Sequence, residues 1–193
     1  KAKKETKDTV VHYDYDLVVL GAGPAGQKAA LAAARYGKKV AMIEPRFLGG
    51  ICTHKGTVPS KTFREAAIHL TNYRLRYMES TFQSTPSMEE LVKRVDWVIE
   101  NDMNSIERQI RGNGIEIIAG YGHFDKDHVL SITPADIEGD KKSKKKFQVT
   151  FHKAVISTGT RPHFREDVDY DGKHIFFTDN ILRLVIKDFA TLE

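Results

Sequence analysis

Residues 15–26, with the sequence YDLVVLGAGPAG, contain the pattern from which the architecture of this chain can be predicted. The apolar, β-branched run 15–20 indicates a buried parallel strand, and the glycines that follow have the spacing G-x-G-x-x-G. Pro24 suits the first turn of a helix, the alanine-rich run 29–34 favours its continuation, and Gly37 is a natural end. We therefore expect a strand, a tight turn and a helix in direct succession.

A second apolar strand at 39–43 completes the predicted unit, and Glu44 stands at its end. Strand, helix and strand within about thirty residues form a βαβ crossover, which is right-handed in nearly every known case. The glycine spacing alone is a weak signal, because glycine-rich turns are common. With a strand before it, a helix after it and an acidic residue about twenty residues later, it is typical of a Rossmann-type dinucleotide-binding unit. An unrelated glycine turn is the less favoured alternative.

Each position of the glycine motif has a physical role in binding a pyrophosphate. Gly21 permits the tight turn, Gly23 has no side chain to block the phosphates, and Gly26 lets the helix pack closely on the strand. Pro24 and Ala25 stand in the first helical turn, where unpaired N–H groups and the positive end of the helix dipole stabilise anionic oxygens. The motif therefore predicts a phosphate site at the start of this helix.

Glu44 predicts which nucleotide this site binds. Its carboxylate can accept hydrogen bonds from the adenosine ribose hydroxyls and would repel a 2′-phosphate, so FAD or NAD is favoured over NADP. Pro45, the next residue, belongs to the same predicted site.

The remainder of the chain alternates between helical and β patterns. Helices are expected at 58–78 and 88–111, and Gly112 and Gly114 end the second one. The apolar stripe of that helix comprises Leu91, Val95, Val98, Met103, Ile106 and Ile110. The β-patterned pieces are 115–119, 122–124, 129–132 and 147–151, with a last short buried strand at 154–157. The predicted fold class is α/β: a Rossmann-like FAD/NAD(P)-binding domain with a parallel central sheet, helices and a small antiparallel β-meander.

The composition limits the class of protein. A length of 193 residues suits one domain, which we place at 13–193, after a flexible basic segment at 1–12. The net charge of +4 comes largely from lysines at the N-terminus and in the run 141–146, so nucleic-acid binding is disfavoured. No apolar run approaches the roughly 18 residues of a membrane span, and a single cysteine excludes an internal disulfide, so we expect a cytoplasmic protein without membrane contact. The histidines show no spacing typical of a metal site.

The single cysteine, Cys52, lies in the stretch 49–61, GGICTHKGTVPSK. A lone cysteine is usually a small buried hydrophobe. This stretch, however, strongly resembles the redox segment of the flavoprotein disulfide reductases, the class I pyridine nucleotide-disulfide oxidoreductases. Those enzymes have a second cysteine five residues after the first, where this chain has Thr57. Cys-Thr-His-x-Gly-Thr followed by Pro-Ser-Lys characterises the soluble pyridine nucleotide transhydrogenases, and without a dithiol the usual relay to disulfide substrates cannot operate.

The resemblance extends to two further segments and implies FAD as the cofactor. Residues 120–124, GYGHF, are similar to the stretch that lies against adenine, and residues 156–162, ISTGTRP, resemble the A-T-G-x-x-P strand end that supports FAD, with Ser157 in place of the alanine. It implies that Cys52 and Thr57 lie beside the isoalloxazine and that Lys61 approaches flavin N5, so these three are the expected catalytic residues. The further cofactor-binding residues it implies are Gly50, Thr53, Tyr121, Gly122, Thr158 and Gly159.

The resemblance also implies an activity, and it covers only the N-terminal FAD-binding part of such an enzyme. The expected function is hydride transfer between NADPH and NAD through FAD, in a homodimer formed by a C-terminal domain that is not in this chain. The nicotinamide nucleotide-binding unit does not follow either, so we expect this chain alone to be inactive. The alternatives are a FAD-dependent NAD(P)H:quinone or oxygen oxidoreductase, a dihydrolipoamide-dehydrogenase-like protein without the redox disulfide, and a nucleotide-binding module without turnover.

Overall fold

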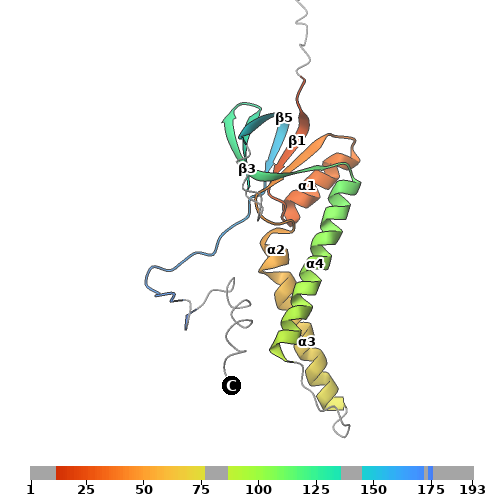
Figure 1. Cartoon of the computed structure of the whole chain (residues 1–193), viewed down its shortest axis with the longest axis vertical. Coiled ribbons are helices and arrows are strands. Elements are labelled where there is room, and N and C mark those ends of the chain that lie inside the picture. Colours follow the sequence, from red (N-terminus) through yellow and green to blue (C-terminus); the bar gives the residue numbers. More distant parts are fainter. Residues whose placement is uncertain (1–11, 77–86, 136–144, 172–173, 176–193) are drawn as a thin grey trace, which may run out of the picture.

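The structure is a computed structural model that describes residues 12–76, 87–135, 145–171 and 174–175. In this part of the chain, a parallel sheet has the strand order β3-β2-β1-β5. The strands are β1 (Tyr15–Leu20), β2 (Val40–Glu44), β3 (Glu116–Lys126), β4 (Val129–Pro134) and β5 (Phe147–Ile156). Strands β3, β4 and β5 also form an antiparallel meander, which lies over the sheet (Figure 1). The α/β class with a parallel sheet and a meander is therefore confirmed.

Two long strands, β3 and β5, belong to both sheets. The first part of β3 pairs in parallel with β2 as far as Ala119, and its second part pairs antiparallel with β4 from Gly120 onward. In β5, residues up to Thr150 pair with β4, and those from Phe151 onward pair with β1. The five strands thereby close into a ring of pairings. The expectation of separate short pieces at 115–119, 122–124, 147–151 and 154–157 was wrong, because each pair of pieces is one continuous bent strand.

Glycines in the middle of β3 explain why a break was expected there. A Cβ on Gly120 would lie 2.7 Å from the carbonyl oxygen of Thr133, and one on Gly122 would lie 3.1 Å from Leu20 Cδ2. These glycines therefore permit close approach between strands rather than a turn. The end of β5 also differs from expectation, since Ile156 is 68% exposed although 154–157 was predicted to be buried. In the described chain, this part of β5 is paired on one side only, with β1.

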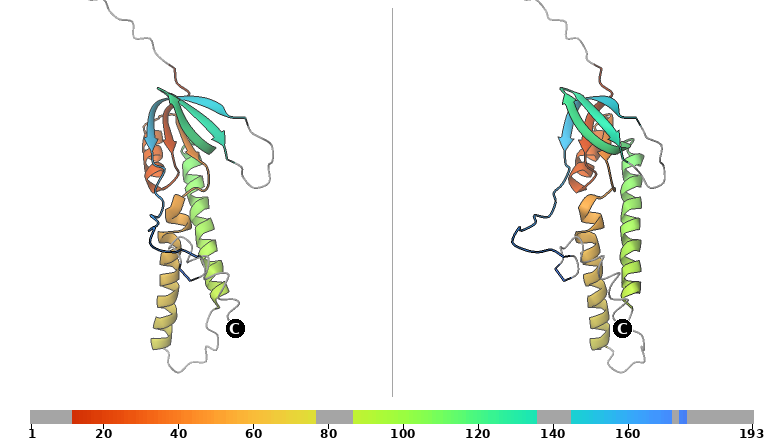
Figure 2. Two further views of the ribbon diagram at one scale, coloured as in Figure 1. Left: turned by 90° about the vertical axis from the view of Figure 1, so that its left-hand side faces the viewer. Right: turned by 60° about the vertical axis from the view of Figure 1, so that its left-hand side comes forward.

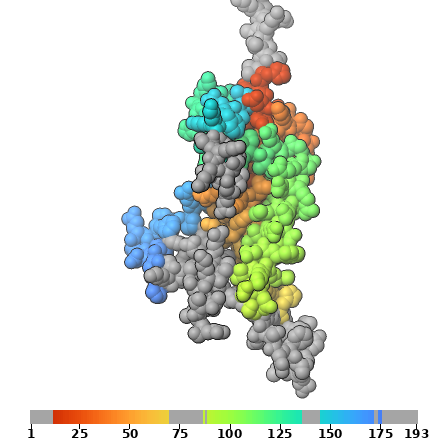
Figure 3. All heavy atoms as spheres, viewed as in Figure 1, coloured from red at the N-terminus to blue at the C-terminus, as the bar shows by residue number. Residues whose placement is uncertain are grey.

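Four helices are described, and their bounds are α1 (Pro24–Arg35), α2 (Gly50–His54), α3 (Thr57–Arg76) and α4 (Met88–Gly112). Helices α1 and α4 cover the face of the parallel sheet opposite the meander, and α3 and α4 run side by side away from it (Figure 2). Figure 3 shows α4 as a band that runs from the sheet along the helix pair. The predicted helices are confirmed, α2 is a helix that was not predicted, and residues 77–78 lie outside the described chain.

The core has two parts, one on each face of the parallel sheet. Val18, Leu20 and Ile43 pack between the sheet and the meander. Val19 and Met42, from the same strands, point the other way and pack against the helices. Both faces of β1 and β2 are therefore buried, as the continuous apolar runs predicted. Of the predicted basic segment 1–12, residues 1–11 lie outside the described chain, as do most of the lysines in 141–146.

Candidate functional site

The glycine motif forms a tight turn between the end of β1 and the start of α1. Gly21 has a φ of +100°, and a Cβ there would lie 2.3 Å from the carbonyl oxygen of Ser157, at the end of the neighbouring strand. A Cβ on Gly26 would lie only 2.0 Å from the Gly21 carbonyl oxygen. Both positions therefore exclude any side chain, and the predicted roles of these two glycines agree with the packing.

Gly23 differs from the other two glycines of the motif, because the space beside it is open. An added Cβ would meet no atom within 4 Å, and its φ of −71° is one that any residue adopts. Gly23 is also the N-cap of α1, where it provides no capping side chain, and Pro24 follows at the start of the helix. The space beside Gly23 at the N-terminus of α1 is therefore open to a ligand, and a pyrophosphate is the kind of anion that a helix N-terminus binds.

Glu44 lies at the end of β2 and is held beside the glycine turn. Its Oε2 atom accepts a hydrogen bond from the N–H of Ala22 at 2.9 Å, and its Oε1 atom accepts one from the N–H of Arg46 at 2.9 Å. Two fixed N–H donors orient the carboxylate at the rim of the turn, and each oxygen keeps a lone pair for a ribose hydroxyl. Pro45, which lies between Glu44 and Arg46 in the sequence, is half-buried.

The segment after β2 returns to the glycine turn before α2 begins. The N–H of Gly49 donates to the carbonyl oxygen of Ala22 at 3.0 Å, and a Cβ on Gly50 would lie 3.1 Å from Gly23 Cα. Gly49 and Gly50 both have positive φ angles, +94° and +61°. The predicted cofactor-binding residues Gly23 and Gly50, which are far apart in the sequence, are therefore brought into contact.

The three expected catalytic residues lie on α2 and the start of α3. Cys52 is half-buried on α2, and Thr57 and Lys61 are exposed one turn apart on α3. At the junction, a Cβ on Gly56 would lie 3.5 Å from Cys52 Cα, so the two helices meet closely there. The start of this segment therefore lies against the glycine turn, and the side chains of Thr57 and Lys61 are exposed.

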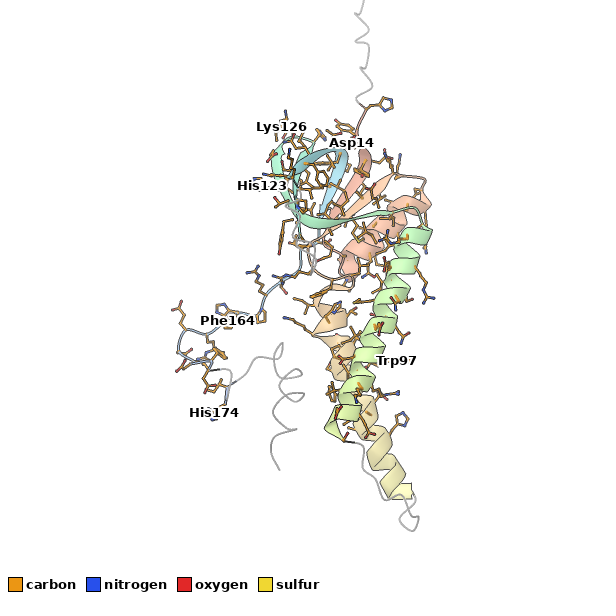
Figure 4. The ribbon with its side chains drawn as sticks, in the orientation of Figure 1. Asp14, Trp97, His123, Lys126, Phe164 and His174 are labelled. Atoms are coloured by element: carbon orange, nitrogen blue, oxygen red, sulfur yellow. The ribbon has the colours of Figure 1, made fainter. Side chains whose placement is uncertain are left out.

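The other predicted cofactor-binding residues lie on β3 and just after β5. Tyr121 is 54% exposed, and Gly122 lies against Leu20, the last residue of β1. A Cβ on Gly21 would lie 3.2 Å from Thr158 Cα, and Gly159 follows with a φ of +74°. From this point the chain leaves the sheet toward Phe164, as Figure 4 shows. The glycine turn, Glu44, Gly50 and Thr158 therefore lie together at the carboxyl ends of β1, β2 and β5, where α/β sheets bind their ligands.

Three polar residues that the sequence analysis did not select support this site. Gln27 Nε2 donates to the carbonyl oxygen of Ala22 at 2.8 Å. Ser157 Oγ donates to the carbonyl oxygen of Leu20 at 2.9 Å, so the hydroxyl that replaces the expected alanine ties β5 to β1. Asp102 on α4 accepts a hydrogen bond from the buried Thr53.

The position of Asp102 in the sequence indicates that this residue has a structural role. Asp102 stands seven residues after Val95 and four before Ile106, which is a position of the apolar stripe. A carboxylate on the buried face of an amphipathic helix indicates a specific partner, because an unpaired charge there is costly. The described residues contain no group of side chains suited to a metal ion, and no described helix is long and apolar enough to cross a membrane.

Comparisons with known proteins agree with the fold of this chain. The family model for pyridine nucleotide-disulphide oxidoreductase matches residues 15–185. The chain is 37% identical over 177 residues to a soluble pyridine nucleotide transhydrogenase of Mycobacterium bovis, and 33% identical over 177 residues to one of Photorhabdus laumondii. These alignments cover 89% and 90% of this chain but 36% of each relative, so the chain spans about a third of their length.

A solved structure is similar in fold. The HOCl-induced flavoprotein disulfide reductase RclA from Escherichia coli superposes with a TM-score of 0.67 at 22% sequence identity. The superposition covers 89% of this chain and 34% of that one. At this identity the similarity concerns the fold, and it agrees with the α/β class predicted from the glycine motif.

Proposed function

The chain belongs to the pyridine nucleotide-disulphide oxidoreductase family, and from this membership we propose that it is the FAD-binding domain of a soluble pyridine nucleotide transhydrogenase. The family confirms the resemblance noted in residues 49–61. The activity proposed for the whole protein is hydride transfer between NADPH and NAD through FAD. We also propose that it works in the cytoplasm as a homodimer.

The observation that carries the proposal is Thr57, five residues after the single cysteine, on a segment that begins at the glycine turn. A disulfide reductase needs a pair of thiols at this place, and this chain has one cysteine in all. An enzyme that only accepts and donates hydride does not need the pair. The 37% identity to a protein named soluble pyridine nucleotide transhydrogenase supports the same choice.

Residues at the carboxyl ends of the parallel strands would hold FAD. The N-terminus of α1 would bind the pyrophosphate, Glu44 the adenosine ribose, and Tyr121 with Gly122 the adenine side. Thr158 and Gly159 would support the cofactor from the end of β5. Bound FAD supplies the hydride chemistry, which the protein positions and tunes.

The segment that begins with α2 would provide the environment of the reacting ring. Cys52 and Thr57 would line it, and neither can carry electrons to a disulfide without a second thiol. The ammonium group of Lys61 would stabilise negative charge that develops there during reduction. The site for NADPH is not among these residues, so for this chain by itself we propose nucleotide binding without turnover.

Two measurements test the proposal, one for FAD binding by this chain and one for hydride transfer by the whole protein. First, the purified chain is mixed with FAD and separated by gel filtration, and a visible band near ~450 nm on the protein shows that it binds flavin. Second, the whole protein is assayed for hydride transfer from NADPH to a spectrally distinct NAD analogue. Efficient reduction of quinones or oxygen, with no transfer to the NAD analogue, would reject the transhydrogenase in favour of another flavin-dependent oxidoreductase.

A further inference from the structure

Helix α2 is short, and its position depends on contacts with the rest of the fold. It has five residues, Gly50–His54, which is too few for an isolated helix to be stable. At its start, the N–H of Gly49 bonds to Ala22, in the glycine turn. At its end, a ring nitrogen of His54 lies 2.9 Å from the carbonyl oxygen of Leu48, a contact within the same segment.

A side-chain hydrogen bond joins α2 to the long helix α4. Thr53 is 4% exposed, and its hydroxyl donates to Asp102 Oδ2 at 2.8 Å, although the two residues are 49 positions apart. The Thr53 side chain is also confined on its other side, since a Cβ on Gly49 would lie 2.5 Å from Thr53 Oγ1. A hydrogen bond to a carboxylate is roughly twice as strong as one between neutral groups. We name this pair the Thr53–Asp102 brace.

The brace fixes the rotation of α2 about its own axis. Successive residues of an α-helix point in directions about 100° apart, because the helix has 3.6 residues per turn. If Thr53 must point at α4, the direction of its neighbour Cys52 is also determined. Loss of the brace would free α2 to rotate or to fray, and Cys52 would then no longer have a single orientation.

We propose that Asp102 is a positioning residue, which acts through Thr53 to hold Cys52 and the segment leading to Thr57 in place beside the cofactor. This inference rests on the proposed function, because that function places Cys52 beside the flavin. It also explains the carboxylate at a stripe position of α4, where an apolar side chain is expected. α4 is anchored by Ile110, which is fully buried against the parallel sheet.

Cys52 is the only thiol of the chain, so its rate of reaction with a chromogenic disulfide reagent reports on α2 alone. The informative variants are Thr53→Val, which keeps the shape but removes the hydroxyl, and Asp102→Ala, which removes the acceptor. Thr53→Ser and Asp102→Asn keep a donor and an acceptor and serve as conservative rescues. Asp96→Asn is the matched control, because Asp96 is an exposed carboxylate on the same helix.

We expect Thr53→Val, Asp102→Ala and their combination each to raise the thiol reaction rate about tenfold, with no further increase in the double variant. The two rescues and Asp96→Asn should stay within about twofold of the unchanged chain. The dissociation constant of FAD should rise severalfold in Asp102→Ala, because Asp102 is outside the set of expected cofactor-binding residues, to which Thr53 belongs. Thermal unfolding followed by circular dichroism identifies any variant that no longer folds. If Thr53→Val or Asp102→Ala does not fold, the thiol rates of Thr53→Ser and Asp102→Asn test the brace instead.

Equal thiol rates in all variants would overturn the brace. Additive effects in the double variant would show that the two residues act separately, and would also overturn it. A raised thiol rate with unchanged FAD affinity would refute the link between the brace and the cofactor. If the unchanged chain takes up no FAD at all, that result counts against the proposed function, and the thiol rates alone decide whether Asp102 positions Cys52.

Discussion

Replacement of Gly23 by alanine separates cofactor binding from folding more cleanly than any other change in the glycine turn. The added methyl group meets no protein atom within 4 Å, and the backbone at φ −71° and ψ 178° accepts alanine. Alanine is a poorer N-cap than glycine by about 0.5–1 kcal/mol, and it recovers a similar amount by restricting the unfolded chain. The free energy of unfolding without FAD should therefore change by no more than about 0.5 kcal/mol.

FAD affinity should respond very differently, because the same methyl group would occupy the space assigned to the pyrophosphate. Overpacking of this kind costs about 1–3 kcal/mol, which corresponds to a rise of roughly 5-fold to 150-fold in the dissociation constant. The assay is a titration followed by flavin fluorescence, with urea unfolding of the same preparations. Gly112→Ala is the control, since a Cβ there also meets nothing within 4 Å and it lies far from the turn in sequence. Wild-type affinity in Gly23→Ala would refute the placement of the phosphates.

Three further predictions concern stability. Gly26→Ala puts a Cβ 2.0 Å from the Gly21 carbonyl oxygen, so we expect a loss of about 2–3 kcal/mol in the urea unfolding free energy, and a smaller effect than in Gly112→Ala would contradict the close packing of α1 on β1. Ser157→Ala removes the hydroxyl that donates to the Leu20 carbonyl oxygen, and should lower the unfolding free energy by about 0.5–1.5 kcal/mol in the same assay; an unchanged value would show that this hydrogen bond does not stabilise the fold. Backbone and side-chain hydrogen bonds from Thr150 hold the pKa of Asp14 in the folded chain below its ordinary value of 3.8. The ionised carboxylate therefore stabilises the fold at pH values above the pKa that Asp14 has in the unfolded chain. This stabilisation is lost as the pH falls through the pKa of Asp14 in the folded chain. The stability difference between the unchanged chain and Asp14→Asn should therefore shrink from pH 7 to pH 3, and a constant difference would show that the Asp14 charge has no part in it.

The residues changed in these predictions lie at opposite ends of the parallel sheet. Asp14 precedes the strand and lies at the opposite end of the sheet from the glycine turn, as Figure 4 shows. Asp14→Asn should therefore leave FAD affinity unchanged. Gly26 and Ser157 lie at the other end, where the site is, so their variants should weaken FAD binding together with stability.

The features predicted correctly from the sequence are those whose physical cause is local. Gly21, Gly23 and Gly26 lie within six residues, and the strand before them and the helix after them are contiguous, so one short pattern contains the whole unit. The helix α4 was found because its apolar stripe repeats over 25 residues. In each case the sequence neighbours are also the spatial neighbours.

The features that were missed depend on residues far apart in the chain. Asp102 has its partner 49 residues away and Ser157 has its partner 137 residues away, so the sequence identifies neither partner, although the position of Asp102 on α4 indicates that it has one. Helix α2 is too short to show a helical period. Gly120 suggested a break in β3, but the reason for this glycine is the proximity of Thr133, which only the folded chain brings close.

The pairing of β1 with β5 has a consequence for synthesis on the ribosome. Tyr15 pairs with Phe151 and Leu20 with Ile156, so β1 emerges 136 residues before its partner. At about 5–20 residues per second, β1 waits roughly 7 to 27 seconds for β5. Gly21 cannot be seated against Ser157 before then. We therefore expect the nascent chain to gain its affinity for FAD late and abruptly, when the strand that ends at Ile156 has been made.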